Sequence, residues 1–221
     1  MNDTILATIP GADFAYVARF ISDESVRYYL QGVQVAPLIT GGVTLVATTS
    51  RVLGAMRLQA TEASATATFI LSASKDLLRA CKARKRILRT IVCRADRVDV
   101  YESYNTDAEK PGTPVYTGHR PYIDGTFPDW RKVLPATVSG SRSEAAHKEG
   151  TAPTWMALNP TLLALFAGSG VPGVSFDWNG AGAILVANSD PRFLGVIMPM
   201  RATTTDADIL DRRAFVAGGV A

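Results

Sequence analysis

The sequence predicts an α+β fold in which one helix and three following strands recur along the chain. Of the 221 residues, 47% are hydrophobic and 19% are charged, a balance typical of a globular protein with its own core. Apolar residues follow helical spacing in some segments and strand-like patterns in others. The order helix, strand, strand, strand appears three times, and a further strand precedes the second and third helices. This recurrence predicts repeated helix-plus-strand units.

The first unit is predicted from residues 12–21, where apolar side chains follow helical spacing, and from two segments rich in β-formers, 26–38 and 43–59. Gly41-Gly42 marks a turn between these segments. A break within the later segment divides it into two strands.

The second unit follows a small polar linker at 61–68. Ser74 is a candidate N-cap for a helix over 75–86, because its hydroxyl can accept a hydrogen bond from an amide of the first turn. The predicted strands of this unit lie at 69–73, on both sides of Ala95-Asp96 within 89–103, and at 115–123.

The third unit follows residues 136–151, whose polar composition predicts a flexible linker. Asn159 is a candidate N-cap and Pro160 suits the first position of a helix. The predicted strands of this unit lie at 153–158, 173–179, 182–189 and 193–201, and a tail follows at 202–221.

Several classes of protein are disfavoured by the sequence. No apolar run reaches 18 residues and the N-terminus lacks a signal-peptide pattern, so we expect a cytoplasmic protein. Cys81 and Cys93 lie in apolar segments and are expected to be buried free thiols. His119 and His147 have no partner at metal-ligand spacing, so neither a metal nor another cofactor is expected. No nucleophile, base and oxyanion-binding group occur together, which indicates a protein that is not an enzyme.

The strongest cluster of charge lies between residues 75 and 97, which hold nine of the 23 Lys and Arg residues. On a helix, four of these cations would share one face, and apolar side chains would face a core on the other. Such a stripe suits contact with the phosphate backbone of duplex DNA, while the alternative is a solvated basic face. The four cations are Lys75, Arg79, Lys82 and Arg86. The apolar side chains are Leu77, Leu78, Cys81 and Leu88.

The stretch IDGTFPDWRKVLP at 123–135 combines a turn signal, two aromatic residues and two prolines. Pro128 forces an extended or turn conformation on Phe127. We therefore expect a connector that presents Phe127 and Trp130 in a fixed pose, and the alternative is a packed connector without a binding role.

Four stretches resemble the β subunit of bacterial DNA polymerase III, the sliding clamp. They are VRYYLQGV at 26–33, TLVATTSRVLGAMR at 44–57, YIDGTFPDWRKVLP at 122–135 and GVIMPMR at 195–201. The last two are specific, and all four occur in the family's order. The resemblance implies a DNA-clamp fold built from half-domains.

The resemblance also implies a division of the chain. Residues 1–135 correspond to the family's middle domain, with half-domains at 1–60 and 67–135, and residues 152–201 to the second half of its last domain. The segments 136–151 and 202–221 are then a linker and a C-terminal tail. Because the family's ring has twelve half-domains, a ring of this chain would be a homo-oligomer of four copies.

In that family the connector and the last strand line a pocket that captures short peptides from polymerases and repair proteins. Adaptable methionine side chains suit such a site. By resemblance, the pocket residues are Leu30, Thr48, Ser50, Arg51, Leu53, Pro128, Lys132, Val133, Val196, Met198, Pro199, Met200 and Arg201. The sequence thus predicts a DNA replication or repair factor that binds duplex DNA and tethers a polymerase. The alternative is a clamp-like adaptor or decoy of phage type that binds such peptides without encircling DNA.

Overall fold

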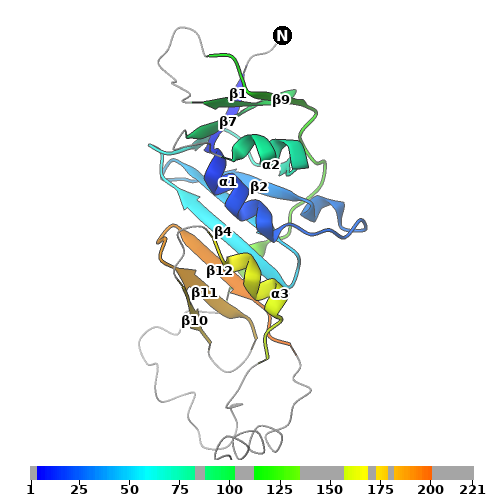
Figure 1. Cartoon of the computed structure of the whole chain (residues 1–221), viewed down its shortest axis with the longest axis vertical. Helices are drawn as coiled ribbons and strands as arrows, with labels where there is room; N and C mark the ends of the chain where they lie inside the picture. Colours follow the sequence, from blue (N-terminus) through cyan, green and yellow to red (C-terminus); the bar gives the residue numbers. More distant parts are fainter. Residues whose placement is uncertain are drawn as a thin grey trace, which may run out of the picture.

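The structure, a computed structural model, describes residues 4–82, 88–102, 112–134, 157–168, 173–178 and 182–200. Within these ranges the chain forms two antiparallel sheets with short helices beside them (Figure 1). No helix in these ranges is both long enough and apolar enough to cross a membrane.

Three units of similar order make up this part of the chain. Unit 1 contains β1 (Ile5–Pro10), α1 (Gly11–Val17), the 3₁₀ turns η1 (Ala18–Phe20) and η2 (Tyr28–Leu30), β2 (Gly32–Pro37), β3 (Val43–Thr48) and β4 (Val52–Leu58). Unit 2 contains β6 (Phe69–Ser72), α2 (Lys75–Cys81), β7 (Arg89–Arg94), β8 (Arg97–Glu102) and β9 (Tyr116–His119). Unit 3 contains α3 (Pro160–Leu163), η4 (Ala164–Phe166), β10 (Val174–Asp177), β11 (Ile184–Asn188) and β12 (Phe193–Ile197). The short strand β5 (Ser64–Ala65) and the 3₁₀ turn η3 (Trp130–Val133) lie in connecting segments.

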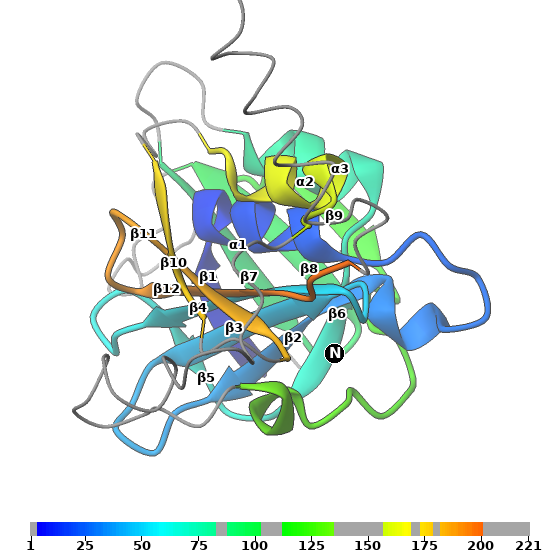
Figure 2. The ribbon, with the colours of Figure 1, turned by 90° about the horizontal axis from the view of Figure 1, so that it is seen from below.

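Units 1 and 2 exchange strands. The strand before α1, β1, pairs with β7 of unit 2, and the strand before α2, β6, pairs with β2 of unit 1. The sheets therefore have the orders β5-β1-β7-β8-β9 and β10-β11-β12-β4-β3-β2-β6. Unit 3 joins the second sheet where β12 pairs with β4. An end-on view shows the three helices on one side of this seven-stranded sheet (Figure 2).

Two strands were not predicted from the sequence. The first unit was predicted to begin at its helix, whereas β1 precedes this helix and buries Ala7 and Ile9. Residues 61–68 were predicted to be a polar linker, whereas Ser64 and Ala65 pair with β1. Both strands are short, and their partners lie far along the chain, so local periodicity gives them little signal.

The predicted helix starts are confirmed. The Ser74 hydroxyl accepts a hydrogen bond from the amide of Leu77 at 3.2 Å. The Asn159 side chain accepts one from the amide of Thr161 at 2.9 Å, and Pro160 occupies the first turn of α3. Caps of this kind satisfy amides that have no partner within the helix.

The helix predicted over 75–86 ends earlier, at Cys81, because Lys82 is already extended with φ −66° and ψ 117°. Leu77 and Cys81 are buried, but Leu88 is exposed rather than facing the core. Residues 82–86 contain four cations and one alanine, so a longer helix would bury nothing and would place like charges one turn apart.

The main core lies between the sheets and the helices. Its largest buried side chains include Phe14, Phe20 and Phe166 from the helical segments. Cys81 and Cys93 belong to it as free thiols, as the sequence predicted, and burial raises the pKa of each thiol to about 12. Both thiols therefore stay protonated at neutral pH and act as small apolar groups.

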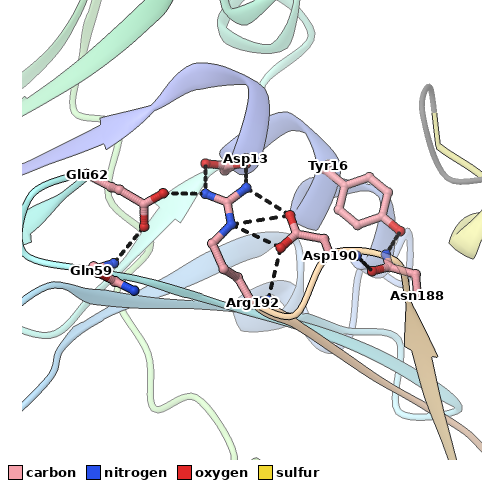
Figure 3. A network of polar contacts seen from close by, with 7 residues as sticks. All are labelled: Asp13, Tyr16, Gln59, Glu62, Asn188, Asp190 and Arg192. Atoms are coloured by element: carbon pink, nitrogen blue, oxygen red, sulfur yellow. Dashed lines mark hydrogen bonds and ion pairs between the residues drawn. The ribbon is translucent and has the colours of Figure 1, made fainter.

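Arg192 fixes unit 3 onto unit 1 (Figure 3). It comes from the turn between β11 and β12, and it donates hydrogen bonds to Asp190 at 2.8 Å and to Glu62 at 2.7 Å. It also contacts Asp13 of α1 at 3.4 Å. The hydrogen bonds from Arg192 lower the pKa of Asp190, whereas burial raises the pKa of Asp13 despite the nearby guanidinium. The turn that leads into β12 is thus held in place by three carboxylates.

Candidate functional site

A cavity of about 270 Å³ lies where unit 1, the connector and the end of β12 meet. Four segments far apart in sequence line it: the η2 turn, the β3–β4 turn, the connector around η3 and the last residues of β12. This volume is near the lower end of the range for small-ligand sites and suits one or two anchoring side chains.

The floor of the cavity is apolar and its rim is mixed. Leu30, Leu53 and Val196 form the floor and are almost completely buried. Val133 and Met198 are about half exposed at the rim. An apolar floor with a few polar groups around the opening is the usual arrangement of a site that captures an apolar side chain.

The β3–β4 turn has a defined shape. Thr48 donates a hydrogen bond through its hydroxyl to the carbonyl of Val52 at 2.8 Å and accepts one from the amide of Ser50 at 3.0 Å. Ser50 has a φ of 73°, which is uncommon for a residue other than glycine. The amide of Met198 donates to the carbonyl of Arg51 at 2.8 Å, which ties the end of β12 to this turn.

The connector is anchored by its two aromatic residues. Phe127 is buried in a second, smaller core together with Leu30, Leu53 and Val196, and Trp130 packs against the same cluster. The guanidinium of Arg131 lies over the Trp130 ring at 4.6 Å from its centroid. The fixed pose expected for Phe127 and Trp130 is therefore present, and the floor of the cavity belongs to the core that the connector completes.

The structure brings nine of the thirteen predicted pocket residues together around this cavity. They are Leu30, Thr48, Ser50, Arg51, Leu53, Pro128, Val133, Val196 and Met198. Lys132, Pro199 and Met200 do not line it. Lys132 is 81% exposed and pairs with Asp129 at 3.5 Å, while the amide of Met200 donates to the carbonyl of Ala157 at 2.8 Å. Arg201 lies outside the described residues.

Five further residues that line the cavity were not predicted from the sequence. They are Arg27, Tyr29, Val52, Asp129 and Trp130. All five lie within the stretches that resemble the clamp, one to three positions from a predicted residue. The signal that would have found Trp130 was the expectation that the connector presents this ring.

The predicted cationic stripe is only partly assembled. Lys75 and Arg79 are exposed on α2, and Arg79 pairs with Asp76 at 3.2 Å. Lys82 is exposed just after the helix rather than on it. Arg86, the linker 136–151 and the tail 202–221 lie outside the described parts of the chain. The helical spacing assumed for the stripe therefore does not hold at Lys82.

A wider hollow of about 540 Å³ lies at the other end of β4, between the β2–β3 turn and Arg192. Turn residues such as Thr40, Gln59 and Thr61 line much of it. It has no floor of buried apolar side chains comparable to that of the smaller cavity, so the smaller cavity is the candidate site.

No protein-family model and no curated protein matches the sequence. Solved structures do match. The DNA polymerase III subunit beta of Borrelia burgdorferi, in complex with a natural product, superposes with a TM-score of 0.63 at 13% identity and covers 91% of this chain and 64% of its own. The Caulobacter crescentus pol III beta gives 0.60 at 19% identity, over 90% and 66%. The clamp of Bartonella birtlesii bound to griselimycin gives 0.59 at 16% identity, over 89% and 66%.

These matches show that the chain has the sliding-clamp fold. The predicted α+β fold of repeated half-domains is confirmed, and so, at the level of the fold, is the resemblance to the beta subunit of bacterial DNA polymerase III. The chain spans about two thirds of the length of the clamps that it matches.

Proposed function

We propose that this chain is a non-enzymatic clamp-type factor of DNA replication or repair, which binds duplex DNA and captures short peptides of polymerase-type partners. The observation that carries this proposal is the cavity between the β3–β4 turn, the connector and β12. It supplies an apolar floor of buried side chains and a rim with Met198, a side chain that adapts to different ligands.

The likeness to known clamps supports the proposal further. Solved clamps with this fold include one bound to griselimycin and one in complex with a natural product. The cavity of this chain lies between segments that resemble clamp motifs in its sequence. Capture of a peptide here needs no chemistry beyond burial of apolar side chains and hydrogen bonds at the rim.

Calorimetric titration with griselimycin, and with a short peptide that carries two adjacent apolar side chains, tests the cavity. We expect both to bind the wild-type chain. Met198→Ala should weaken binding about five- to thirtyfold, because losing part of a buried methionine side chain costs roughly 1–2 kcal/mol.

Met200→Ala is the matched control, because this residue is the same type, lies two positions away and does not line the cavity. It should leave both affinities within about twofold of the wild type. Equal losses in the two variants would contradict the assignment of the cavity, and a wild-type chain that binds neither probe would exclude the peptide-binding role.

Binding to duplex DNA separates the two functions predicted from the sequence. A factor that holds DNA should bind a duplex of random sequence with an affinity that falls steeply as salt rises. A clamp-like adaptor should bind the peptide but show no such salt-dependent affinity for the duplex.

A further inference from the structure

Each of the three units pairs the segment that leads into its helix with the segment that follows its last strand. The pairs are Ala7 with Ala65, Leu71 with Tyr122, and Ala157 with Met200. In each unit, the first residue of the pair lies three or four positions before the start of the helix. Within its own unit, the segment that leads into α3 therefore pairs with the segment equivalent to those used in units 1 and 2.

In units 1 and 2, the leading segment also has a second partner, on its other side. Ala7 lies opposite Cys93 of β7, and Leu71 lies opposite Val33 of β2. The exchange is reciprocal, since each unit gives its leading strand to the first strand after the helix of the other unit. Each of these two sheets is thereby completed by its neighbour.

Within the described residues, unit 3 has the corresponding parts without a second partner. β10, the first strand after α3, is the last strand of the seven-stranded sheet, and within the described ranges only β11 pairs with it. The leading segment at Ala157 is bridged to Met200 on one side. Units 1 and 2 already complete each other, so neither is available to complete unit 3.

Burial on β10 agrees with the lack of a second partner among the described residues. The inward-facing residues of β2 and β7, which are Val33, Val35, Ile91 and Cys93, are all 0% exposed. On β10, Val174 and Trp178 pack against the same core, and alternation places Phe176 on their face of the sheet. Phe176 is nevertheless 39% exposed. The third unit thus presents an apolar strand at the place where the first two units are covered.

We propose that unit 3 pairs with unit 3 of a second copy of this chain by the same reciprocal exchange. The described residues next to the start of α3, Ala157 and Leu158, would lie beside β10 of the other copy, and Phe176 would become buried between them. Because the exchange is reciprocal, two identical units satisfy it with a two-fold axis, and the contact closes at a dimer. An apolar edge strand is otherwise a site of uncontrolled strand pairing, and Asp177 at the end of β10 is the one charged residue of this strand.

Light scattering after gel filtration, over a range of protein concentrations, tests this proposal on the full chain. The wild type should approach twice the monomer mass, and Phe176→Asp should raise the dissociation constant of the dimer at least about tenfold. The matched control is Ile39→Asp, which changes another exposed apolar residue, in the β2–β3 connection away from β10. This variant should dimerise like the wild type.

Amide hydrogen exchange on the wild-type chain gives a second measurement that requires no variant. Exchange at residues 174–177 should slow as concentration rises, while β11 should change little. A wild-type chain that stays monomeric at every concentration would overturn the proposal. So would a dimer that persists in Phe176→Asp with unchanged exchange at β10, since its interface would lie elsewhere.

Discussion

Gly54 and Gly195 lie opposite each other in the register of β4 and β12, and a phenylalanine ring covers each of them. A Cβ atom on Gly54 would lie 2.3 Å from Cδ2 of Phe20, and one on Gly195 would lie 2.3 Å from Cε1 of Phe166. The two rings are 5.0 Å apart between centroids. Phe20 ends η1 of unit 1, and Phe166 ends η4 of unit 3. Each unit therefore contributes the same contact, a phenylalanine ring over a strand glycine, to the junction between them.

Gly195→Ala should therefore destabilise the protein. The new methyl group must displace the buried Phe166 ring, and overpacking of this kind costs about 1–3 kcal/mol. Chemical denaturation measures the loss directly. Gly173→Ala is the control, because a Cβ at that position meets no atom within 4 Å, and it should leave stability nearly unchanged. Equal stability of the two variants would mean that the position of the Phe166 ring does not require a glycine at residue 195.

Asp99 on β8 carries the second prediction. Its carboxylate accepts hydrogen bonds from Arg94 at 3.1 Å, from Arg97 at 3.2 Å and from the Thr117 hydroxyl at 2.7 Å. Arg94 and Asp99 are both almost completely buried. Asp99→Ala removes the carboxylate that three groups share and that pairs with the buried Arg94 guanidinium, so we expect a loss of about 3–5 kcal/mol in unfolding free energy.

The exposed pair of Arg79 and Asp76 provides the comparison for Asp99, since it has a similar separation of 3.2 Å. Asp76→Ala should cost no more than about 1 kcal/mol, because exposed ion pairs contribute little. If Asp99→Ala cost as little unfolding free energy as Asp76→Ala, burial would not determine how much an ion pair contributes to stability.

Helix starts and most strands could be predicted because their causes are local. Ser74 and Asn159 act through amides two or three residues away, and the turn at Gly41-Gly42 needs the positive φ that glycine allows. The end of α2 was mispredicted because cation spacing alone does not stabilise a helix. A helix this short depends on burial, and the buried stripe of α2 ends at Cys81.

The exchange of strands and the junction of units could not be read from local patterns. β1 finds its partners around residues 65 and 90–94, and no periodicity within 5–10 specifies either. Most of the cavity was predicted because the motifs that resemble clamps contain its lining. Arg192 was missed since its role depends on Asp13 and Glu62, which only the folded chain brings to it.

Asp190 carries a prediction on pH. Hydrogen bonds from Arg192 lower the pKa of this carboxyl below its ordinary value of 3.8. A lowered pKa contributes stability above the unfolded value, and that contribution is lost as pH falls through the folded value. The stability difference between wild type and Asp190→Asn should therefore be largest above about pH 5 and shrink as pH falls below about 4.

Asp13 provides the opposite case in the same network. Its pKa is raised, chiefly by burial, so the folded state binds a proton there more readily than the unfolded state. The stability of the wild type relative to Asp13→Asn should thus increase as pH falls. Thermal unfolding between about pH 2.5 and 6 measures both trends. If the stability difference from wild type changed with pH in the same direction for both variants, the opposite pKa shifts assigned to Asp190 and Asp13 would be wrong.

The last prediction concerns the exposed cations near α2. Lys75 and Lys82 are both exposed, whereas the charge of Arg79 is partly offset by Asp76. If the proposed contact with duplex DNA uses this surface, reversing both lysines to glutamate should weaken binding. The slope of log affinity against log salt should also become shallower by roughly 0.9 for each phosphate that the variant no longer neutralises. The control reverses Arg51, which lines the cavity, and Lys132 of the nearby connector, which changes the net charge of the chain by the same amount. A loss confined to the Lys75 and Lys82 variant would place the DNA contact at α2 and the residue that follows it. Equal losses in both variants would show that only net charge matters, and an unchanged slope would exclude this surface.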